Sequence, residues 1–146
     1  MVFYLSRFPE FSRRGHFISS SGGTALFIIE SALTKGLRFS SVWSVGNSKQ
    51  IGVEEVIEYM DRNFDPVLDS KIKMLYIEQI KNPDKLLYHA SSLIRKGCHI
   101  AAIKAGSTDV GKRAASSHTG AIANSDSAVE ALFRKAGIVR CFSVKN

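Results

Sequence analysis

The fold is decided by residues 15–45, which read GHFISSSGGTALFIIESALTKGLRFSSVWSV. Residues 15–19 predict a short strand, and residues 39–45, rich in Val, Trp and Ser, predict a second one. Between them, residues 22–35 predict a helix that ends before Gly36, because apolar residues recur at helical spacing: Ala25, Ile28, Ile29, Ala32 and Leu33. This stretch therefore predicts a strand, a helix and a strand in sequence.

The same alternation continues along the chain. Val53, Val56, Ile57 and Met60 predict the buried stripe of a second helix, with Glu54, Glu55 and Glu58 on its other face. Three more strands are expected at 72–77, 99–103 and 138–143. Asn82-Pro83 starts a helix that ends before Gly97, and Ser125 caps one that ends at Gly137.

Strands that alternate with helices are typical of a parallel sheet covered on both faces. We therefore expect an α/β protein, a three-layer α/β/α sandwich with a flavodoxin-like, five-stranded, mainly parallel sheet. The 146 residues fit one domain, which we place at residues 15–146, with residues 1–14 as a linker or tail.

Composition excludes several classes of protein. Twenty Lys and Arg against thirteen Asp and Glu give a net charge of +7, but the basic residues are scattered, so we expect small anionic ligands and no nucleic acid. No apolar run has the roughly 20 residues of a membrane helix, and we expect no membrane association. Two cysteines and no visible secretory signal indicate a cytoplasmic protein, and no His/Cys cluster suggests a metal site.

Ligands bind at the carboxyl ends of the strands in an open parallel sheet. The first predicted strand is followed by Ser20, Ser21, Gly22 and Gly23, where small residues at a helix start favour a phosphate. A tight strand-to-helix turn explains the same residues equally well.

A long segment after the fourth predicted strand contains His118 among small and hydroxyl residues, and neutral imidazole is a good nucleophile toward phosphoryl groups. Ser117, Thr119 and Gly120 flank it as candidate hydrogen-bond donors. Glu78 ends the third predicted strand and is placed to hold the second ring nitrogen. The residues alone are equally consistent with a plainer interpretation, in which His118 is an ordinary solvent-exposed histidine and Glu78 is a solvated acid at the end of a strand.

Four ordered blocks, GHFISSSGGTAL, FSSVWSVGN, LYIEQIKN and IKAGSTDVGKRAASSHTGAIANSD, resemble the phosphohistidine domain of NDP-forming acyl-CoA synthetases. Within that family, the chain is most similar to the ADP-forming acetate–CoA ligases, and more distantly to succinyl-CoA synthetase. Ser20 stands where the family often has Gln, and Gln50 where an acid is common.

The resemblance implies an acid–thiol ligase in which His118 is transiently phosphorylated and Glu78 supports it. Ser20 to Gly23 would cradle the phosphate, and Ser117, Thr119 and Gly120 would shape the histidine loop. Its partners would be phosphate or acyl phosphate, a CoA-binding domain and an ATP-grasp domain or subunit, where CoA, ATP or ADP, and Mg²⁺ bind. The domain would be inactive in isolation and compatible with homo- or hetero-oligomers.

Two other functions stay open at this point. The chain also resembles the acetyl-CoA-sensing regulatory region of protein lysine acetyltransferases, although the intact SHTG around His118 favours the ligase. A flavodoxin-like nucleotide- or flavin-binding module is the other alternative. The residues do not identify the acyl group or choose between ADP and GDP.

Overall fold

The computed structural model of the chain describes residues 2–3, 14–46, 49–106 and 125–142. From Arg14 onward, strands and helices alternate as predicted from the sequence. The described elements are β1 (Val2–Phe3), β2 (Arg14–Ser19), α1 (Gly22–Thr34), β3 (Arg38–Ser44), α2 (Val53–Arg62), β4 (Ile72–Ile77), α3 (Pro83–Arg95), β5 (His99–Lys104), α5 (Asp126–Ala136) and β6 (Val139–Cys141).

The strands form one sheet in the order β1-β3-β2-β4-β5-β6. All neighbours from β3 to β6 are parallel, which confirms the flavodoxin-like arrangement of five parallel strands. β1 was not predicted: Val2 and Phe3 pair antiparallel with Trp43 and Val42 of β3. Arg14, expected at the end of the linker, begins β2. A strand of only two residues shows no periodicity in the sequence, so β1 can be recognised only from its pairing with the edge of β3.

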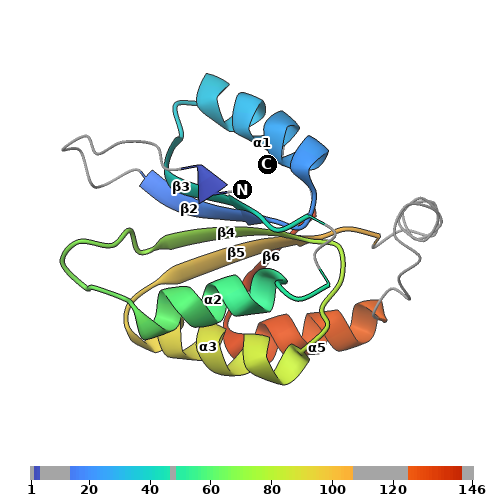
Figure 1. Cartoon of the computed structure of the whole chain (residues 1–146). Coiled ribbons are helices and arrows are strands. Elements are labelled where there is room, and N and C mark those ends of the chain that lie inside the picture. Colours follow the sequence, from blue (N-terminus) through green and yellow to red (C-terminus); the bar gives the residue numbers. More distant parts are fainter. Residues whose placement is uncertain (1, 4–13, 47–48, 107–124, 143–146) are drawn as a thin grey trace.

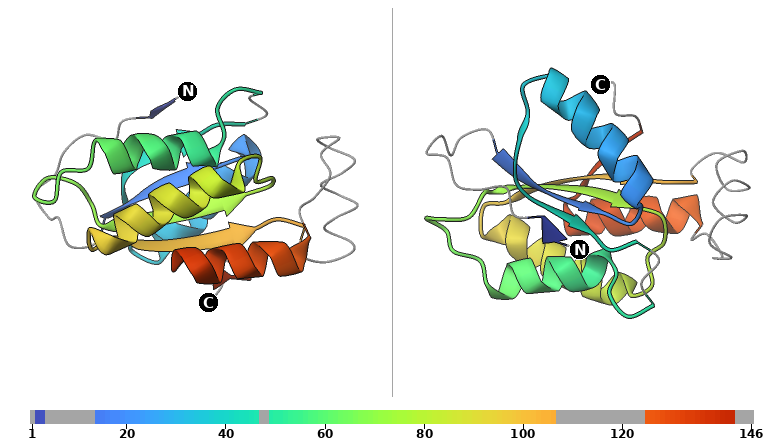
Figure 2. Two further views of the ribbon diagram at one scale, coloured as in Figure 1. Left: turned by 90° about the horizontal axis from the view of Figure 1, so that it is seen from below. Right: turned by 45° about the horizontal axis from the view of Figure 1, so that its top comes forward.

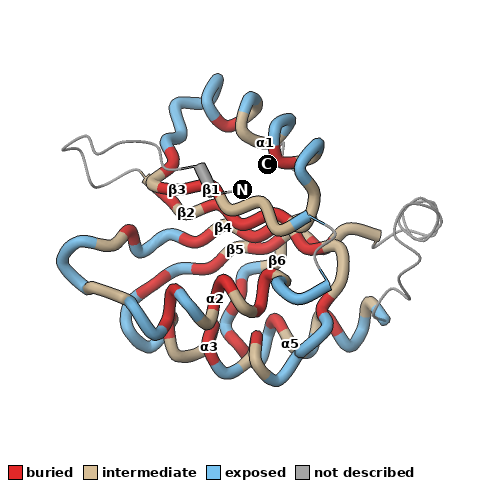
Figure 3. Tube along the Cα trace, viewed as in Figure 1, coloured by how far each residue is buried: buried red, intermediate tan, exposed pale blue. Residues whose placement is uncertain are grey.

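Helices cover both faces of the sheet (Figure 1). α1 lies on one face, while α2, α3 and α5 lie side by side on the other, as two further views agree (Figure 2). Buried residues concentrate on the sheet and on the helix sides that meet it (Figure 3). The three layers predicted from the sequence are therefore present.

The predicted buried stripe of α2 is confirmed, since Val53, Val56, Ile57 and Met60 are all buried. The expectation that Glu54 faces solvent is wrong, because only 1% of it is exposed. Its carboxylate accepts hydrogen bonds from the backbone amides of Lys81 (2.5 Å) and Asn82 (3.0 Å), which lie between β4 and α3. These two partners make burial of the charge tolerable.

Cys98 is buried and Cys141 is half-buried, and neither forms a disulfide. Among the described residues, the structure contains no helix with the length and apolarity needed to cross a membrane.

Candidate functional site

The parallel register brings the carboxyl ends of four strands to one edge of the sheet, which we call the carboxyl edge. Ser19 of β2 is aligned with Ser44 of β3 and Tyr76 of β4. Ile77 of β4 is aligned with Lys104 of β5. Hydrogen bonds continue just past the strands: the Ser20 amide donates to the Tyr76 carbonyl (2.9 Å), and the Ala105 amide donates to the Ile77 carbonyl (2.8 Å).

α1 begins at the carboxyl edge, and Ser21 is its N-cap. The Ser21 hydroxyl accepts a hydrogen bond from the Thr24 amide at 3.4 Å, as an N-cap side chain should. Two residues before the N-cap, the Ser19 hydroxyl donates a hydrogen bond to the Ser21 carbonyl (2.7 Å) and accepts one from the Ser21 amide (3.1 Å). The turn between β2 and α1 is thus fixed by its own hydroxyl groups.

Gly22 and Gly23 form the first turn of α1, and both are exposed. Neither has a positive φ. A Cβ added to Gly22 would meet the Ser44 hydroxyl at an ordinary 3.7 Å, and one added to Gly23 would meet nothing within 4 Å. Neither backbone conformation nor crowding therefore requires glycine here. What two glycines do provide is bare backbone at the positive end of a helix, where an anion can approach closely.

Glu78 is the first residue after β4 and is half-buried. Its backbone carbonyl accepts a hydrogen bond from the Lys104 ammonium at 2.8 Å. Because Ser20 bonds to Tyr76, two residues before Glu78, the α1 turn and Glu78 lie on adjoining strand ends. The structure therefore places Ser20 and Glu78 on adjoining strand ends of the carboxyl edge.

Lys104 is the last residue of β5, and only 5% of it is exposed. Besides the carbonyl of Glu78, its ammonium donates to the carbonyl of Ala105 at 2.8 Å. Burial lowers the pKa of Lys104, and repulsion from Arg140 acts in the same direction, while the charges of Asp126 and Glu78 oppose both. A buried cation thus lies within the electrostatic reach of the Glu78 carboxylate.

His118, with Ser117, Thr119 and Gly120, lies outside the described residues. The described chain leaves β5 at Lys104 and resumes at Ser125, the N-cap of α5, whose hydroxyl accepts a hydrogen bond from the Ala128 amide at 3.3 Å. Arg140 of β6 holds the start of α5 through ion pairs with Asp126 and with Glu130 (2.9 Å). Both flanks of the segment that contains His118 are thus anchored.

Sequence reasoning placed Lys104 directly after the fourth predicted strand but gave it no role, and it missed the burial of Glu54; both residues contact the chain between β4 and α3. The burial of Lys104 could have been predicted from its strand. In HIAAIK, every second residue is buried, namely Ile100, Ala102 and Lys104, so the period of two places Lys104 on the buried side. Its partner at Glu78 lies 26 residues away and required the strand order.

Two of the other three histidines have structural partners. His16 Nδ1 lies 2.6 Å from the Ser41 hydroxyl, and His89 Nδ1 lies 2.8 Å from Asp61 Oδ2. His99 is exposed at the start of β5, at the opposite edge of the sheet. In the described part of the chain, His, Cys, Asp and Glu form no group able to hold a metal ion.

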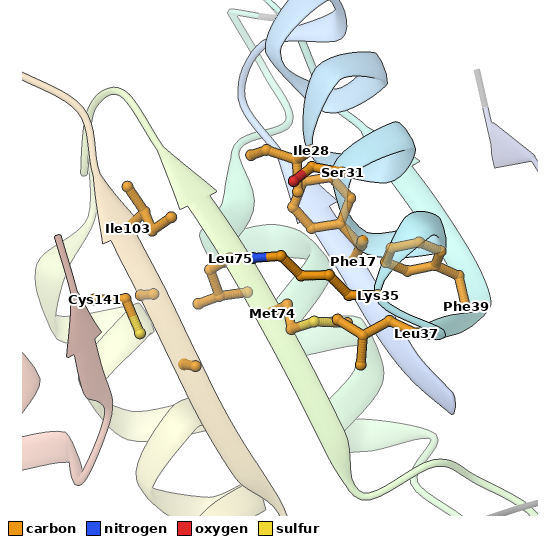
Figure 4. Close-up of a pocket in the computed structure, with 13 residues that line it drawn as sticks. Phe17, Ile28, Ser31, Lys35, Leu37, Phe39, Met74, Leu75, Ile103 and Cys141 are labelled. Atoms are coloured by element: carbon orange, nitrogen blue, oxygen red, sulfur yellow. The ribbon is translucent and has the colours of Figure 1, made fainter. Parts of the chain in front are cut away.

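A cavity of about 180 Å³ lies elsewhere, beside the C-terminal half of α1 (Figure 4). Its walls are mostly apolar and include Ile28, Leu37, Met74 and Ile103, with the Lys35 side chain reaching across them. It includes neither Glu78 nor any residue of the Ser20–Gly23 turn. This cavity is therefore a feature of the α1 face of the sheet, separate from the carboxyl edge.

Comparison with protein families settles the relationship of this chain to known proteins. The model described as "Succinyl-CoA ligase like flavodoxin domain" matches residues 13–146. The chain belongs to this family.

Two curated relatives of this succinyl-CoA ligase-like domain are ADP-forming acetate–CoA ligases. The protein of Methanocaldococcus jannaschii is 40% identical over 126 residues, which are 86% of this chain and 17% of the relative. The alpha subunit of acetate–CoA ligase II of Pyrococcus furiosus is 33% identical over 123 residues, 84% of this chain and 26% of that subunit.

A solved relative is the dinucleotide-forming acetyl-coenzyme A synthetase 1 of Ca. Korarchaeum cryptofilum in complex with phosphate and ADP. It superposes with a TM-score of 0.80 at 32% identity, over 92% of this chain and 28% of its own. This chain thus spans between 17% and 28% of the length of these relatives. It is homologous to one domain of these ligases.

Proposed function

We propose that this chain is the phosphoryl-relay domain of an ADP-forming acyl-CoA synthetase, in which His118 carries phosphate between an acyl phosphate and ADP. The observation that carries the proposal is the composition of the carboxyl edge. The exposed diglycine start of α1, Glu78 directly after β4 and Lys104, which precedes the segment that contains His118, all lie at this edge, in a domain whose relatives are ADP-forming ligases.

The first step is attack by a ring nitrogen of His118 on the phosphorus of an acyl phosphate. The N–P bond forms as the P–O bond to the acyl group breaks, and the carboxylate leaves with the electron pair. In the second step a terminal phosphate oxygen of ADP attacks the same phosphorus. The N–P bond then breaks, its electron pair returns to the ring, and ATP is formed.

The domain's own residues would stabilise the phosphorylated ring. A phosphoryl group carries between one and two negative charges near neutral pH. The N-terminus of α1 with Ser20 to Gly23 would contribute roughly 0.3–1 kcal/mol, and up to ~2 kcal/mol if partly shielded from water. Glu78 would accept a hydrogen bond from the second ring nitrogen and balance the positive charge of the ring. Ser117, Thr119 and Gly120 would complete the phosphate contacts.

The full reaction also needs groups that the described residues do not supply. A CoA-binding domain would present the acyl phosphate, and an ATP-grasp domain or subunit would bind ADP with Mg²⁺. The relatives extend well beyond the matched region, which supports the presence of such modules in these enzymes. Similarity to the relatives favours acetyl as the acyl group, and a screen of acyl phosphates as phosphoryl donors tests this choice.

Radiolabelling tests the relay directly. The chain is incubated with [γ-³²P]ATP, Mg²⁺ and a purified ATP-grasp module, and we expect label that is lost in acid and survives base, the signature of phosphohistidine. His118→Asn should abolish this label completely. His99→Asn is the matched control, because His99 is exposed at the opposite edge of the sheet and should label normally. Acid-labile label that persists in His118→Asn contradicts the assignment.

A further inference from the structure

Lys104 joins two segments of the carboxyl edge that are distant in sequence. Its ammonium donates to the carbonyl of Glu78, the first residue after β4, and to that of Ala105, the first residue after β5, each at 2.8 Å. A third hydrogen bond, from the Ala105 amide to the Ile77 carbonyl (2.8 Å), closes the same junction. The ammonium thus links the main chain of Glu78 to the turn that leads toward His118.

The chain offers an internal comparison, because β4 carries another buried lysine. Lys73 is 1% exposed, and burial lowers its pKa as it does for Lys104. Its ammonium donates to the carbonyl of Ser70 and lies 5.5 Å from the centre of the Phe64 ring. These contacts lie at the opposite edge and involve neither Glu78 nor its neighbours. Burial of a lysine therefore does not by itself indicate a role in the site.

What distinguishes Lys104 is its partner. The backbone carbonyl that it holds belongs to the residue whose carboxylate is the candidate support of His118. Charged hydrogen bonds are short and strong, and in a buried location the ammonium has no water to replace its carbonyl partners. Loss of the ammonium would therefore free the Glu78 backbone on the side that faces β5.

We propose that Lys104 is a positioning residue of the phosphoryl relay, which fixes the Glu78 backbone against the turn after β5 and thereby sets where the Glu78 carboxylate lies. This inference rests on the proposed function, since it assigns Lys104 a part in the same site. It predicts that Lys104 affects the rate of histidine phosphorylation through Glu78 and not through the phosphoryl donor's affinity.

The test compares labelling rates of the wild type with those of Lys104→Met, Lys104→Arg and the matched control Lys73→Met. Outer partners of metal-bound imidazoles and carboxylates typically contribute about 10–100-fold to activity, and by analogy we expect Lys104→Met to label about 10–100-fold more slowly at unchanged half-saturation by the donor. Lys104→Arg should recover part of the rate, and Lys73→Met should stay within about twofold of the wild type, since it acts on stability alone.

A double-mutant cycle separates positioning from a general loss of structure. If Lys104 acts through Glu78, then Glu78→Gln and Lys104→Met together should label no more slowly than the slower single variant, within about threefold. If the rate losses of Glu78→Gln and Lys104→Met multiply in the double variant, the proposal is overturned. It is also overturned if Lys104→Met is folded by circular dichroism and labels at the full rate. If Lys104→Met does not fold, Lys104→Gln replaces it, because the shorter neutral amide of Gln cannot reproduce the two charged hydrogen bonds of the ammonium. A full labelling rate in that folded variant likewise overturns the proposal.

The two proposals fail in different ways. A wild-type chain that takes no acid-labile label overturns the relay, and the role of Lys104 in it. A labelled wild type with a folded, fully active Lys104→Met variant overturns only the role of Lys104.

Discussion

The two faces of this sheet are packed very differently. The face beneath α2, α3 and α5 carries a cluster of eighteen buried residues that includes Ile57, Leu93 and Phe133. The face beneath α1 carries five: Phe17, Ala25, Ala32, Phe39 and Val42. Only two small residues of α1 are fully buried, while Leu26 is 66% and Phe27 63% exposed. The cavity beside α1 belongs to this sparsely packed face.

This difference separates stability from ligand binding. Amphipathic helices on the first face bury wide apolar stripes, which is where most hydrophobic stabilisation arises. α1 contributes little buried area, but its first turn lies at the carboxyl edge with Ser20 to Gly23. Ser21 and the short β2–α1 turn hold that end in place by local hydrogen bonds. The well-packed face thus stabilises the fold, and the sparse face presents the helix start.

The largest expected effect contrasts two phenylalanines. Phe133 of α5 is 1% exposed, and Phe133→Ala should lower the free energy of unfolding by about 3–5 kcal/mol through lost burial and a cavity. Phe27→Ala on α1 should change it by less than about 0.5 kcal/mol, because the ring is already in water. Urea unfolding of both variants measures the contrast, and similar losses for the two would refute the difference between the faces.

A pH effect sharpens the description of the well-packed face. His16 points toward this face, since it alternates with Phe17, and its partner Ser41 also accepts a hydrogen bond from the Trp43 indole (2.8 Å). Burial, aided by the charge of Lys73, lowers the pKa of His16 from 6.5 to about 4. Between these values the unfolded chain binds a proton that the folded chain does not, so acidification favours unfolding.

The wild type should therefore lose up to about 3 kcal/mol of unfolding free energy between pH 6.5 and 4 that a His16→Asn variant does not lose. Urea unfolding at several pH values across this window measures the difference between the two proteins. Because the carboxylates titrate in both proteins, their contribution to the unfolding free energy cancels in the difference between wild type and His16→Asn. Parallel pH profiles would show that His16 is not buried in its neutral form.

The smallest expected effect compares the caps of two helices on opposite faces. Ser21 caps α1 and Ser125 caps α5 through the same kind of hydroxyl-to-amide contact. Replacement of either by Ala should cost about 1 kcal/mol in thermal or urea unfolding. Ser21→Ala should slow histidine labelling about two- to fivefold more than Ser125→Ala does, because the proposed phosphate lies at the start of α1. Equal labelling by both variants would argue against a phosphate at α1.

Much of the fold was predictable because its signals are local. The apolar strand at residues 72–77 and the apolar stripe of α2 were recognisable from nearby residues, and Asn82 and Ser125 are N-caps as the sequence predicted. Leu33 was expected on the core side of α1 but is 45% exposed. A helix with apolar residues on all sides does not reveal which side is covered.

The sequence by itself determined the element order, the residues at the carboxyl ends of the strands and the resemblance that points to His118 and Glu78. Only the tertiary structure decided that Glu54 is buried beneath Lys81 and Asn82, that Lys104 holds Glu78, and that Val2–Phe3 pairs with β3. Periodicity and capping depend on neighbours within a turn or two of the chain. These contacts join residues more than twenty-five positions apart, and they exist only once strand order and register bring them together.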